Sequence, residues 1–307
     1  MKRINTLNIK NSPPTPVSKP VVNGHALPSG TVLDDYIIER VLAQGGFSTV
    51  YLARQIKDQQ QVAIKEYKPE KLTSRQGAIV KPVDQASVIL FQRGRALFME
   101  EAKLLSTLKH PNIVRVLSFF LANDTAYLVM NFDYGTTLGN WLKNPVNLVD
   151  DPFLLDVFQP VMRCIKNMHH RGLLHLDIKP DNILLRPSNN PLILDFGSAL
   201  PYKRKYPLSS HSMTKGYAAP EQQHKQHELG PWSDIYAIGA SMRTCLDRAA
   251  PPASAELELK NELQAAHQLY KKTINPKILH AIDWAMQIDP AKRPQTMDEL
   301  INSINYL

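Results

Sequence analysis

The polar residues of one short stretch, HLDIKPDNILL (His175 to Leu185), have types and spacing that suit a charged ligand. Asp177, Lys179 and Asn182 lie close together there, and the flanking apolar residues place them at the edge of a core. The strand-like stretch LILDFGSA follows, and it ends in Asp195. Carboxylate and amide oxygens are hard ligands that bind divalent cations. The two stretches therefore predict Asp177, Asn182 and Asp195 near one another, although KPDN alone also fits a solvated turn.

A second stretch, LAQGGFSTVYLA (Leu42 to Ala53), is either a phosphate-covering loop or a plain turn between two strands. Glycine lets a backbone approach a ligand closely, and a phosphate cover uses the spacing G-x-G-x-x-G. Ala43, Gly45 and Ser48 occupy those three places, so only the middle glycine is present. Taken alone, the stretch fits a hairpin better than a phosphate loop.

The elements that must position these stretches are predicted from composition and periodicity. Strand-like segments rich in β-branched residues begin near Tyr36, and a single helical pattern covers Ala96 to Leu108. From Pro152 onward the pattern is helical. We therefore expect an α+β fold with a small β-rich lobe over about 31–131 and a larger helical lobe over about 134–307. A cleft between two such lobes is a common ligand site.

Composition restricts the class of protein. The chain has 307 residues and a net charge of +8, and its Pro-rich residues 1–30 carry basic residues without an acid. We predict a disordered tail over 1–30 and one domain over 31–307. The remaining charge is too mild and too scattered to predict nucleic-acid binding, and no apolar run approaches the roughly 18 residues of a membrane span. Cys164 and Cys245 are expected to be buried thiols in the reducing cytoplasm.

These residues, taken with four further motifs, resemble the protein kinase family. H-x-D-x-x-x-x-N followed by D-F-G is the catalytic set of that family. The sequence also holds VAIK ending at Lys65, APE ending at Glu221, DIYAIG beginning at Asp234, and DPAKRP with Arg293. The resemblance runs from about Tyr36 to the end of the chain. It is closest to the eukaryotic-like (Hanks-type) serine/threonine kinases of bacteria, which share the bilobal fold expected here.

The resemblance implies a catalytic role for four residues. Asp177 would accept the proton of the attacking hydroxyl, and Lys179 would neutralise charge on the γ-phosphate during transfer. Lys65 would pair with the α- and β-phosphates of ATP and with Glu101. The spacing to the His-Pro pair that follows the helix selects this glutamate over its neighbour Glu100.

The resemblance also implies the cofactors, ATP and Mg²⁺ (or Mn²⁺ in its place). Asn182 and Asp195 would hold the metal ion. The glycine stretch would then cover the ATP phosphates, and backbone groups beside it would bind the adenine edge. The expected ATP-binding residues are Leu42, Ala43, Gly45, Gly46, Ser48, Val50, Ala63, Lys65, Met130, Asn131, Asp133 and Leu184.

Other matching residues have structural roles in the family. Glu221 and Arg293 would form a buried ion pair, and Thr214 would hydrogen-bond Asp177 and Lys179. A column of side chains would join the two lobes, built from Leu105, Val116, His175 and Phe196.

The sequence departs from the family pattern at two places. Leu176 stands where most regulated kinases have an arginine that binds a phosphate of the activation segment, here Asp195 to Glu221. We therefore predict that phosphorylation of Ser209, Ser210 or Ser212 is not an obligatory on-switch through that contact. The polar stretch 68–92 is predicted as a long connection, either a partner surface or, as we favour, a tolerated insertion.

Three stretches suggest sites that we do not favour. MHHRGLLH (Met168 to His175) suggests a metal site, but it ends a helix and enters a core. HKQHEL (His224 to Leu229) lacks the second histidine of H-E-x-x-H. KRK (Lys203 to Lys205) either selects acidic substrates or is a solvated face, and we favour the latter.

The leading interpretation is an ATP-dependent serine/threonine protein kinase whose substrates are Ser and Thr hydroxyls of proteins, with autophosphorylation of its tail. Lys179 supports Ser/Thr over Tyr by resemblance. A pseudokinase that binds nucleotide as a scaffold and a small-molecule kinase on the same fold are the alternatives. Related bacterial kinases also suggest a phosphothreonine-reading FHA partner, which no residue here demonstrates.

Overall fold

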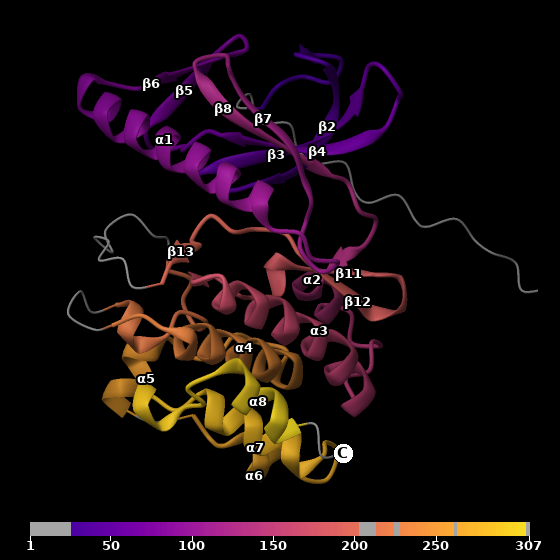
Figure 1. Ribbon diagram of the computed structural model, residues 1–307, viewed down its shortest axis with the longest axis vertical. Coiled ribbons are helices and arrows are strands. Elements are labelled where there is room, and N and C mark those ends of the chain that lie inside the picture. The colour runs from indigo at the N-terminus through magenta and orange to yellow at the C-terminus, as the bar shows by residue number, and fades with distance from the viewer. Residues whose placement is uncertain (1–25, 203–212, 224–227, 261–262, 305–307) are drawn as a thin grey trace, which may run out of the picture.

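The computed structural model describes residues 26–202, 213–223, 228–260 and 263–304. A sheet crossed by one long helix forms a small lobe, and a bundle of helices forms a larger one beneath it (Figure 1). The predicted α+β fold with two lobes is confirmed.

The small lobe is built on a six-stranded antiparallel sheet in the order β1-β2-β3-β4-β8-β7. Side chains alternate between its two faces, as strand geometry requires. Val62 and Ile64 belong to one apolar cluster, whereas Ala63 belongs to the other, which includes the long helix. The strands are β1 (Val32–Leu33), β2 (Tyr36–Gln44), β3 (Ser48–Gln55), β4 (Gln61–Tyr67), β7 (Val116–Ala122) and β8 (Thr125–Asn131).

The stretch predicted as a connection over 68–92 is ordered, so that prediction is wrong. It forms a hairpin of β5 (Thr73–Gln76) and β6 (Ile79–Pro82), followed directly by α1 (Gln85–Thr107). The helix thus begins well before the predicted Ala96. Its first half buries Phe91 against Tyr67 of β4 but exposes the neighbouring Ile89 and Leu90, so the apolar residues there do not follow the helical period.

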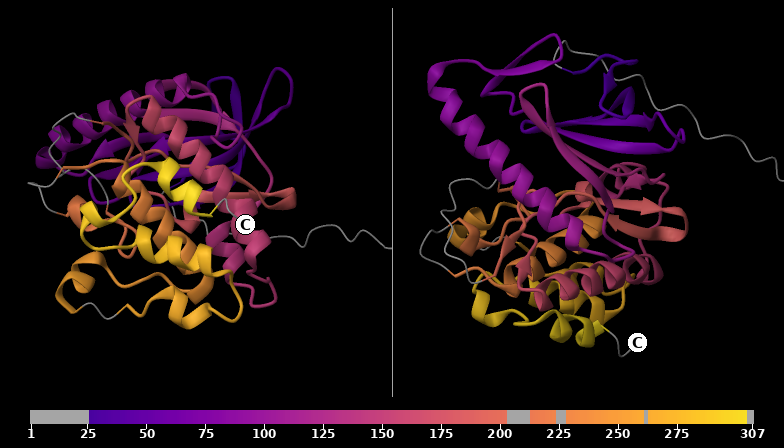
Figure 2. Two further views of the ribbon diagram at one scale, coloured as in Figure 1. Left: turned by 60° about the horizontal axis from the view of Figure 1, so that its bottom comes forward. Right: turned by 45° about the horizontal axis from the view of Figure 1, so that its top comes forward.

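The larger lobe is built around one buried helix, α4 (Pro231–Asp247). The other helices of this lobe are α2 (Leu138–Leu142), α3 (Asp151–His170), α5 (Ser254–Lys260), α6 (Ala266–Tyr270), α7 (Pro276–Ala285) and α8 (Met297–Ile304). Of these, α3, α7 and α8 pack against α4, and Figure 2 shows the lobe in two further views. In the described ranges no helix is both long and apolar enough to cross a membrane.

Short strands at the top of the larger lobe carry the loops with the polar motifs. One small sheet has the order β12-β11-β9, and β10 pairs with β13. Backbone bonds join Val114, after α1, to Ile193 and tie the two lobes together (N···O 3.0 Å). The strands are β9 (Thr136–Thr137), β10 (Leu173–Leu174), β11 (Ile183–Arg186), β12 (Asn190–Ile193) and β13 (Leu200–Pro201).

The ordered chain starts before the predicted boundary at residue 31. Ala26 and Leu27 are buried in the upper cluster of the small lobe, and the Leu27 N–H donates to the Tyr51 hydroxyl (3.1 Å). The remainder of the predicted tail, residues 1–25, lies outside the described residues.

Candidate active site

The loop between β10 and β11 is held by a buried carboxylate from α4. Asp234 accepts the backbone N–H groups of His175 (2.9 Å) and Leu176 (2.7 Å). Leu176 has φ 63°, a left-handed conformation that is unfavourable for a side chain with a Cβ. Its carbonyl also accepts a bond from Gln222 (3.0 Å), so bonds on both sides hold the strained residue. The shape of the loop therefore depends on Asp234. The sequence showed this residue only as the first of the DIYAIG motif, without its contact to the loop.

The polar side chains of this loop converge on Asp177. Lys179 Nζ donates to both carboxylate oxygens (2.8 and 3.1 Å), and Asn182 Nδ2 donates to Oδ2 (3.0 Å). The Thr214 hydroxyl donates to Asp177 Oδ1 (2.7 Å) and accepts from Lys179 (2.8 Å). Lys179, Asn182 and Thr214 thus orient the Asp177 carboxylate. Thr214 makes the hydrogen bonds to Asp177 and Lys179 that the resemblance implied.

The replacement Thr214→Val is expected to lower kcat for phosphate transfer roughly 10-fold, because one hydrogen bond that orients Asp177 is lost. Thr214→Ser keeps the hydroxyl and is expected to stay near wild type. Steady-state kinetics measures both, with mass spectrometry to show that Thr214 itself carries no phosphate. A wild-type kcat in the valine variant would argue against this orienting role.

A second group of charged residues joins the two lobes. Lys65 on β4 donates to Asp195 Oδ1 (2.7 Å) and lies 3.8 Å from Glu101 on α1. Glu101, not the exposed Glu100, faces the lysine, as the spacing predicted. The structure therefore brings residues from β4, α1 and the end of β12 to one place.

The charges in this group shift one another's pKa values. Burial would lower the pKa of Lys65, but Asp195 and Glu101 raise it instead. Desolvation would raise the pKa of Asp195, yet the charge of Lys65 and bonds from Lys65 and Gly197 lower it to about 2. Burial raises the pKa of Glu101 to about 7, and Lys65 opposes that rise only in part. Lys65 thus stays charged while it contacts two carboxyls of different acidity.

The variant Glu101→Gln is expected to change how stability depends on pH. The pKa of Glu101 is raised from 4.5 to about 7, so the folded protein keeps a proton that the unfolded chain releases. The free energy of unfolding of wild type, relative to the variant, should fall as pH rises from about 4.5 to 7 and then level off. Urea unfolding across this range measures it, with Glu100→Gln controlling for the loss of one charge. A constant difference would contradict the raised pKa.

The residues predicted to bind ATP come from both lobes. Leu42, Val50, Ala63, Met130 and Leu184 belong to or pack against one apolar cluster, with Leu184 coming from the larger lobe. The other predicted residues lie beside them. Ala43 pairs with Val50, Gly45 and Gly46 turn between β2 and β3, Ser48 begins β3, Asn131 ends β8, and Asp133 contacts Arg186 (3.4 Å).

One contact of the predicted column between the lobes is present. The rings of His175 and Phe196 lie 4.8 Å apart, and Leu105 and Val116 pack in the same core. Likewise, Arg293 donates to both carboxylate oxygens of Glu221 (2.8 and 3.0 Å) in the lobe below. Both arrangements are those expected from the resemblance.

The comparisons with known proteins agree with this geometry. A family model described as the protein kinase domain matches residues 36–304. The chain belongs to the protein kinase family. Within that family, its bacterial serine/threonine relatives confirm the predicted Hanks-type kinase of the bacterial kind.

Individual relatives of this kinase are similar over most of its length. Serine/threonine-protein kinase D of Synechocystis is 28% identical over 90% of this chain and 53% of its own. PknD of Chlamydia caviae is 26% identical over 86% of this chain and 30% of its own. The solved structure of PpkA-294 in its apo form has a TM-score of 0.83 at 33% identity, covering 92% of this chain and 100% of its own. The chain thus spans about half or less of these two curated relatives.

Of the three stretches that suggested other sites, only MHHRGLLH (Met168 to His175) lies wholly within the described residues. His169 Nε2–H donates to the Asp234 carboxylate (2.8 Å), and the ring of His175 packs on Phe196. The predictions for Ser209, Ser210, Ser212, Lys203–Lys205 and most of His224–Leu229 lie outside the described residues.

One histidine pair in the kinase's larger lobe resembles a metal site but has a structural role. His267, His280 and Asp283 bring ligand atoms within 4.8 Å of one another. However, Asp283 already accepts the backbone N–H groups of Ala266 (2.6 Å) and His267 (3.1 Å) and so caps α6. The two imidazole rings stack 4.9 Å apart at 25°, and His267 Nδ1 is hydrogen-bonded to Asp283 (2.7 Å).

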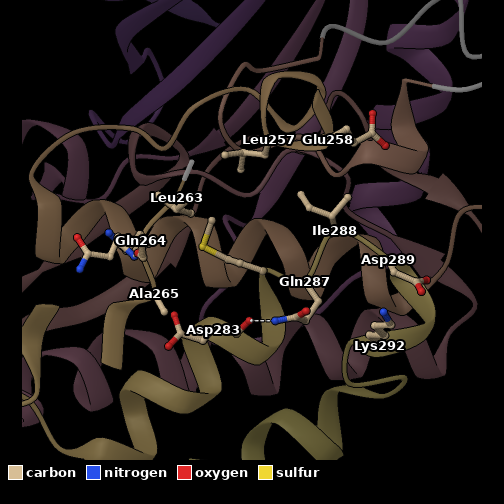
Figure 3. Close-up of a pocket in the computed structure, with 12 residues that line it drawn as sticks. Leu257, Glu258, Leu263, Gln264, Ala265, Asp283, Gln287, Ile288, Asp289 and Lys292 are labelled. Atoms are coloured by element: carbon tan, nitrogen blue, oxygen red, sulfur yellow. Dashed lines mark hydrogen bonds between the residues drawn. The ribbon is translucent and has the colours of Figure 1, made fainter. Parts of the chain in front are cut away.

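A pocket of about 440 Å³ lies between α4, α5 and α7, and Asp283 forms part of its wall (Figure 3). Its walls combine apolar side chains such as Leu257 and Ile288 with charged ones such as Glu258 and Lys292. None of the predicted catalytic, ATP-binding or metal-binding residues lines it.

Proposed function

We propose that this kinase transfers the γ-phosphate of ATP to Ser and Thr hydroxyls of proteins, with Mg²⁺ or Mn²⁺ as cofactor. The observation that carries the proposal is the set of charged residues that the fold brings together. In the larger lobe, Asp177 is bonded to Lys179 and Thr214. From the small lobe, Lys65 donates to Asp195 of the larger lobe and lies beside Glu101. Phosphoryl transfer needs positioning and charge neutralisation rather than covalent chemistry from the protein.

Asp177 would take the proton of the attacking hydroxyl. Its carboxylate is already oriented by Thr214 and Lys179, which supports its role as the base. Lys179 would then turn its charge toward the transferring phosphate, because its flexible chain reaches both. Lys65 would hold the α- and β-phosphates, with Glu101 fixing the lysine from the side of α1.

Asn182 and Asp195 would hold the metal ion, and their oxygens suit it. Asn182 uses its amide Nδ2–H on Asp177, so its amide oxygen is left to accept. The hydrogen bonds that described residues make to Asp195 go to Oδ1. Such oxygens are the hard ligands that Mg²⁺ prefers. When bound, the ion supplies positive charge beside the phosphates.

The two alternatives receive less support. A nucleotide-binding scaffold needs none of the transfer residues, yet Asp177, Lys179, Asn182 and Asp195 are all present and clustered. A small-molecule kinase is disfavoured by Lys179 and by the APE segment.

We further propose that the kinase phosphorylates itself and that it has a phosphothreonine-reading FHA partner. We also propose a reducing compartment such as the cytoplasm, which suits the free buried thiols Cys164 and Cys245.

The test is incubation of the purified chain with γ-labelled ATP and Mg²⁺, with and without a mixture of proteins, beside Lys65→Met. We expect labelled protein with wild type and at most trace label with the variant. Nucleotide binding without any transfer would favour the scaffold. Label that appears only on small molecules would favour a small-molecule kinase.

A further inference from the structure

The tip of the glycine stretch is hydrogen-bonded to chain outside its own hairpin. The ladder between β3 and β4 runs to the pair Ser48–Tyr67, and then continues past the end of β4. Lys68 N–H donates to Phe47 O (2.9 Å), and Glu70 N–H donates to Gly46 O (2.9 Å). Two of the three residues between β2 and β3 are thus held by backbone donors of the segment that leads into the β5–β6 hairpin.

That segment is itself closed into a turn. Leu72 N–H donates to Pro69 O (3.1 Å), and the Thr73 hydroxyl donates to the same carbonyl (2.8 Å). Val83 N–H then donates to Leu72 O (3.0 Å), which closes the hairpin beside the turn. The donor of Glu70 therefore belongs to a defined turn, not to a loose loop.

The hairpin is anchored in the small lobe by a buried ionic cluster. Arg75 on β5 donates to Glu66, the residue after Lys65, and both side chains are almost fully buried. Glu66 also accepts the hydroxyls of Tyr51 (2.8 Å) and Tyr127 (2.7 Å). A carboxylate withdrawn from water in this way is stable only while its partners stay in place. Val80 on β6 adds a backbone bond to Asn123 between β7 and β8 (2.9 Å).

The hairpin also leads straight into the helix that carries Glu101. Its last residues reach Asp84, whose carboxylate accepts Ser87 N–H (2.8 Å) and caps α1. One segment, 68–84, thus contacts the glycine stretch at one end and starts α1 at the other. The stretch 68–92, which the sequence predicted as a tolerated insertion, has contacts that suit a supporting role.

We propose that segment 68–84 is a positioning element that holds the phosphate-covering loop in place for ATP through the backbone N–H groups of Lys68 and Glu70. This inference rests on the proposed function and deepens it. Two of the three glycines that shape such a loop are replaced here by Ala43 and Ser48. The external bonds therefore supply order to a loop that keeps Gly45 and Gly46, and glycine is the residue type with the greatest backbone freedom.

The test removes a single donor. Glu70 is the second residue of the Pro69–Leu72 turn, a position that proline favours, so Glu70→Pro deletes the N–H with little local strain. Glu70→Ala keeps the N–H and loses only an exposed side-chain bond to Gln44 (3.3 Å). We expect the proline variant to raise KM for ATP about 3- to 10-fold with kcat within about twofold, and the alanine variant to stay within about twofold of wild type.

Two readouts separate this role from a general loss of structure. The Kd for Mg²⁺-ATP, measured by calorimetry without any transfer, should rise together with KM. Because this measurement needs no phosphate transfer, it tests the positioning role even if the proposed kinase activity is not found. Amide exchange should increase at residues 45–47 while the melting temperature stays within a few degrees. If the proline variant does not fold, the same readouts on Arg75→Met combined with Glu66→Gln, which release the hairpin's anchor, should shift in the same direction.

The inference is overturned by an unchanged Kd and KM for ATP in the proline variant. It is equally overturned if Glu70→Ala raises KM as much as Glu70→Pro, because the side chain and not the backbone donor would then matter. A fall in kcat with an unchanged KM also contradicts it.

Discussion

Replacing Asp177 by Asn is expected to lower kcat for phosphate transfer by about 10²- to 10⁴-fold, while the Kd for nucleotide stays within about twofold. The amide has the shape of the carboxylate and still accepts the bond from Thr214, but it cannot take the proton of the attacking hydroxyl. Single-turnover transfer of labelled phosphate measures the rate, and calorimetry measures the binding.

Asp181→Asn is the matched control, because it makes the same chemical change in the same loop at an exposed carboxylate. Its kcat is expected to stay near wild type. A loss of activity in Asp181→Asn as large as that in Asp177→Asn would mean that loop charge, not proton acceptance, explains the effect. An active Asp177→Asn would exclude Asp177 as the base.

The second large effect concerns stability. Arg293→Met is expected to lower the free energy of unfolding by about 3–5 kcal/mol, because it leaves the buried carboxylate of Glu221 without its cation. Both side chains are fully buried, and Arg293 also donates to the carbonyl oxygens of Gln287 (2.6 Å) and Ile288 (2.8 Å). Urea unfolding followed by circular dichroism measures the loss.

Two comparisons identify the cause of that loss. Lys166→Met breaks a partly exposed ion pair with Asp298 and is expected to cost less than about 1 kcal/mol. Adding Glu221→Met to Arg293→Met removes the unpaired charge and is expected to restore part of the stability. Equal losses in Arg293→Met and Lys166→Met would show that burial of the pair is not decisive.

The clustering of polar side chains in the loop around Asp177 was predictable from the sequence because these residues are close together in the chain. The loop holds Asp177, Lys179 and Asn182 within six residues, so their spacing in the sequence largely determines that their side chains meet. Lys65 and Asp195 are far apart in sequence, and only the resemblance to a family brought them together. Their contact depends on packing between lobes, which periodicity does not reveal.

The hairpin and the first half of α1 were not predictable by the same means. In the first half of α1, Ile89 and Leu90 are exposed beside the buried Phe91, so the apolar period that marks a helix is absent there. What orders the hairpin is the buried contact of Arg75 with Glu66, between residues of opposite charge that look solvated in a sequence. The hydrogen bond of Glu70 to Gly46 uses a backbone N–H, which the residue types in a sequence do not reveal.

The most direct test of the central claim is to identify the amino acid that receives the phosphate. The purified chain is incubated with ATP and Mg²⁺ alone and with a protein mixture, and the labelled proteins are hydrolysed and analysed by mass spectrometry. We predict phosphoserine and phosphothreonine that depend on Mg²⁺ and are absent with Asp177→Asn. Phosphotyrosine alone, or no phosphoamino acid from a folded protein that binds ATP, would contradict a serine/threonine kinase.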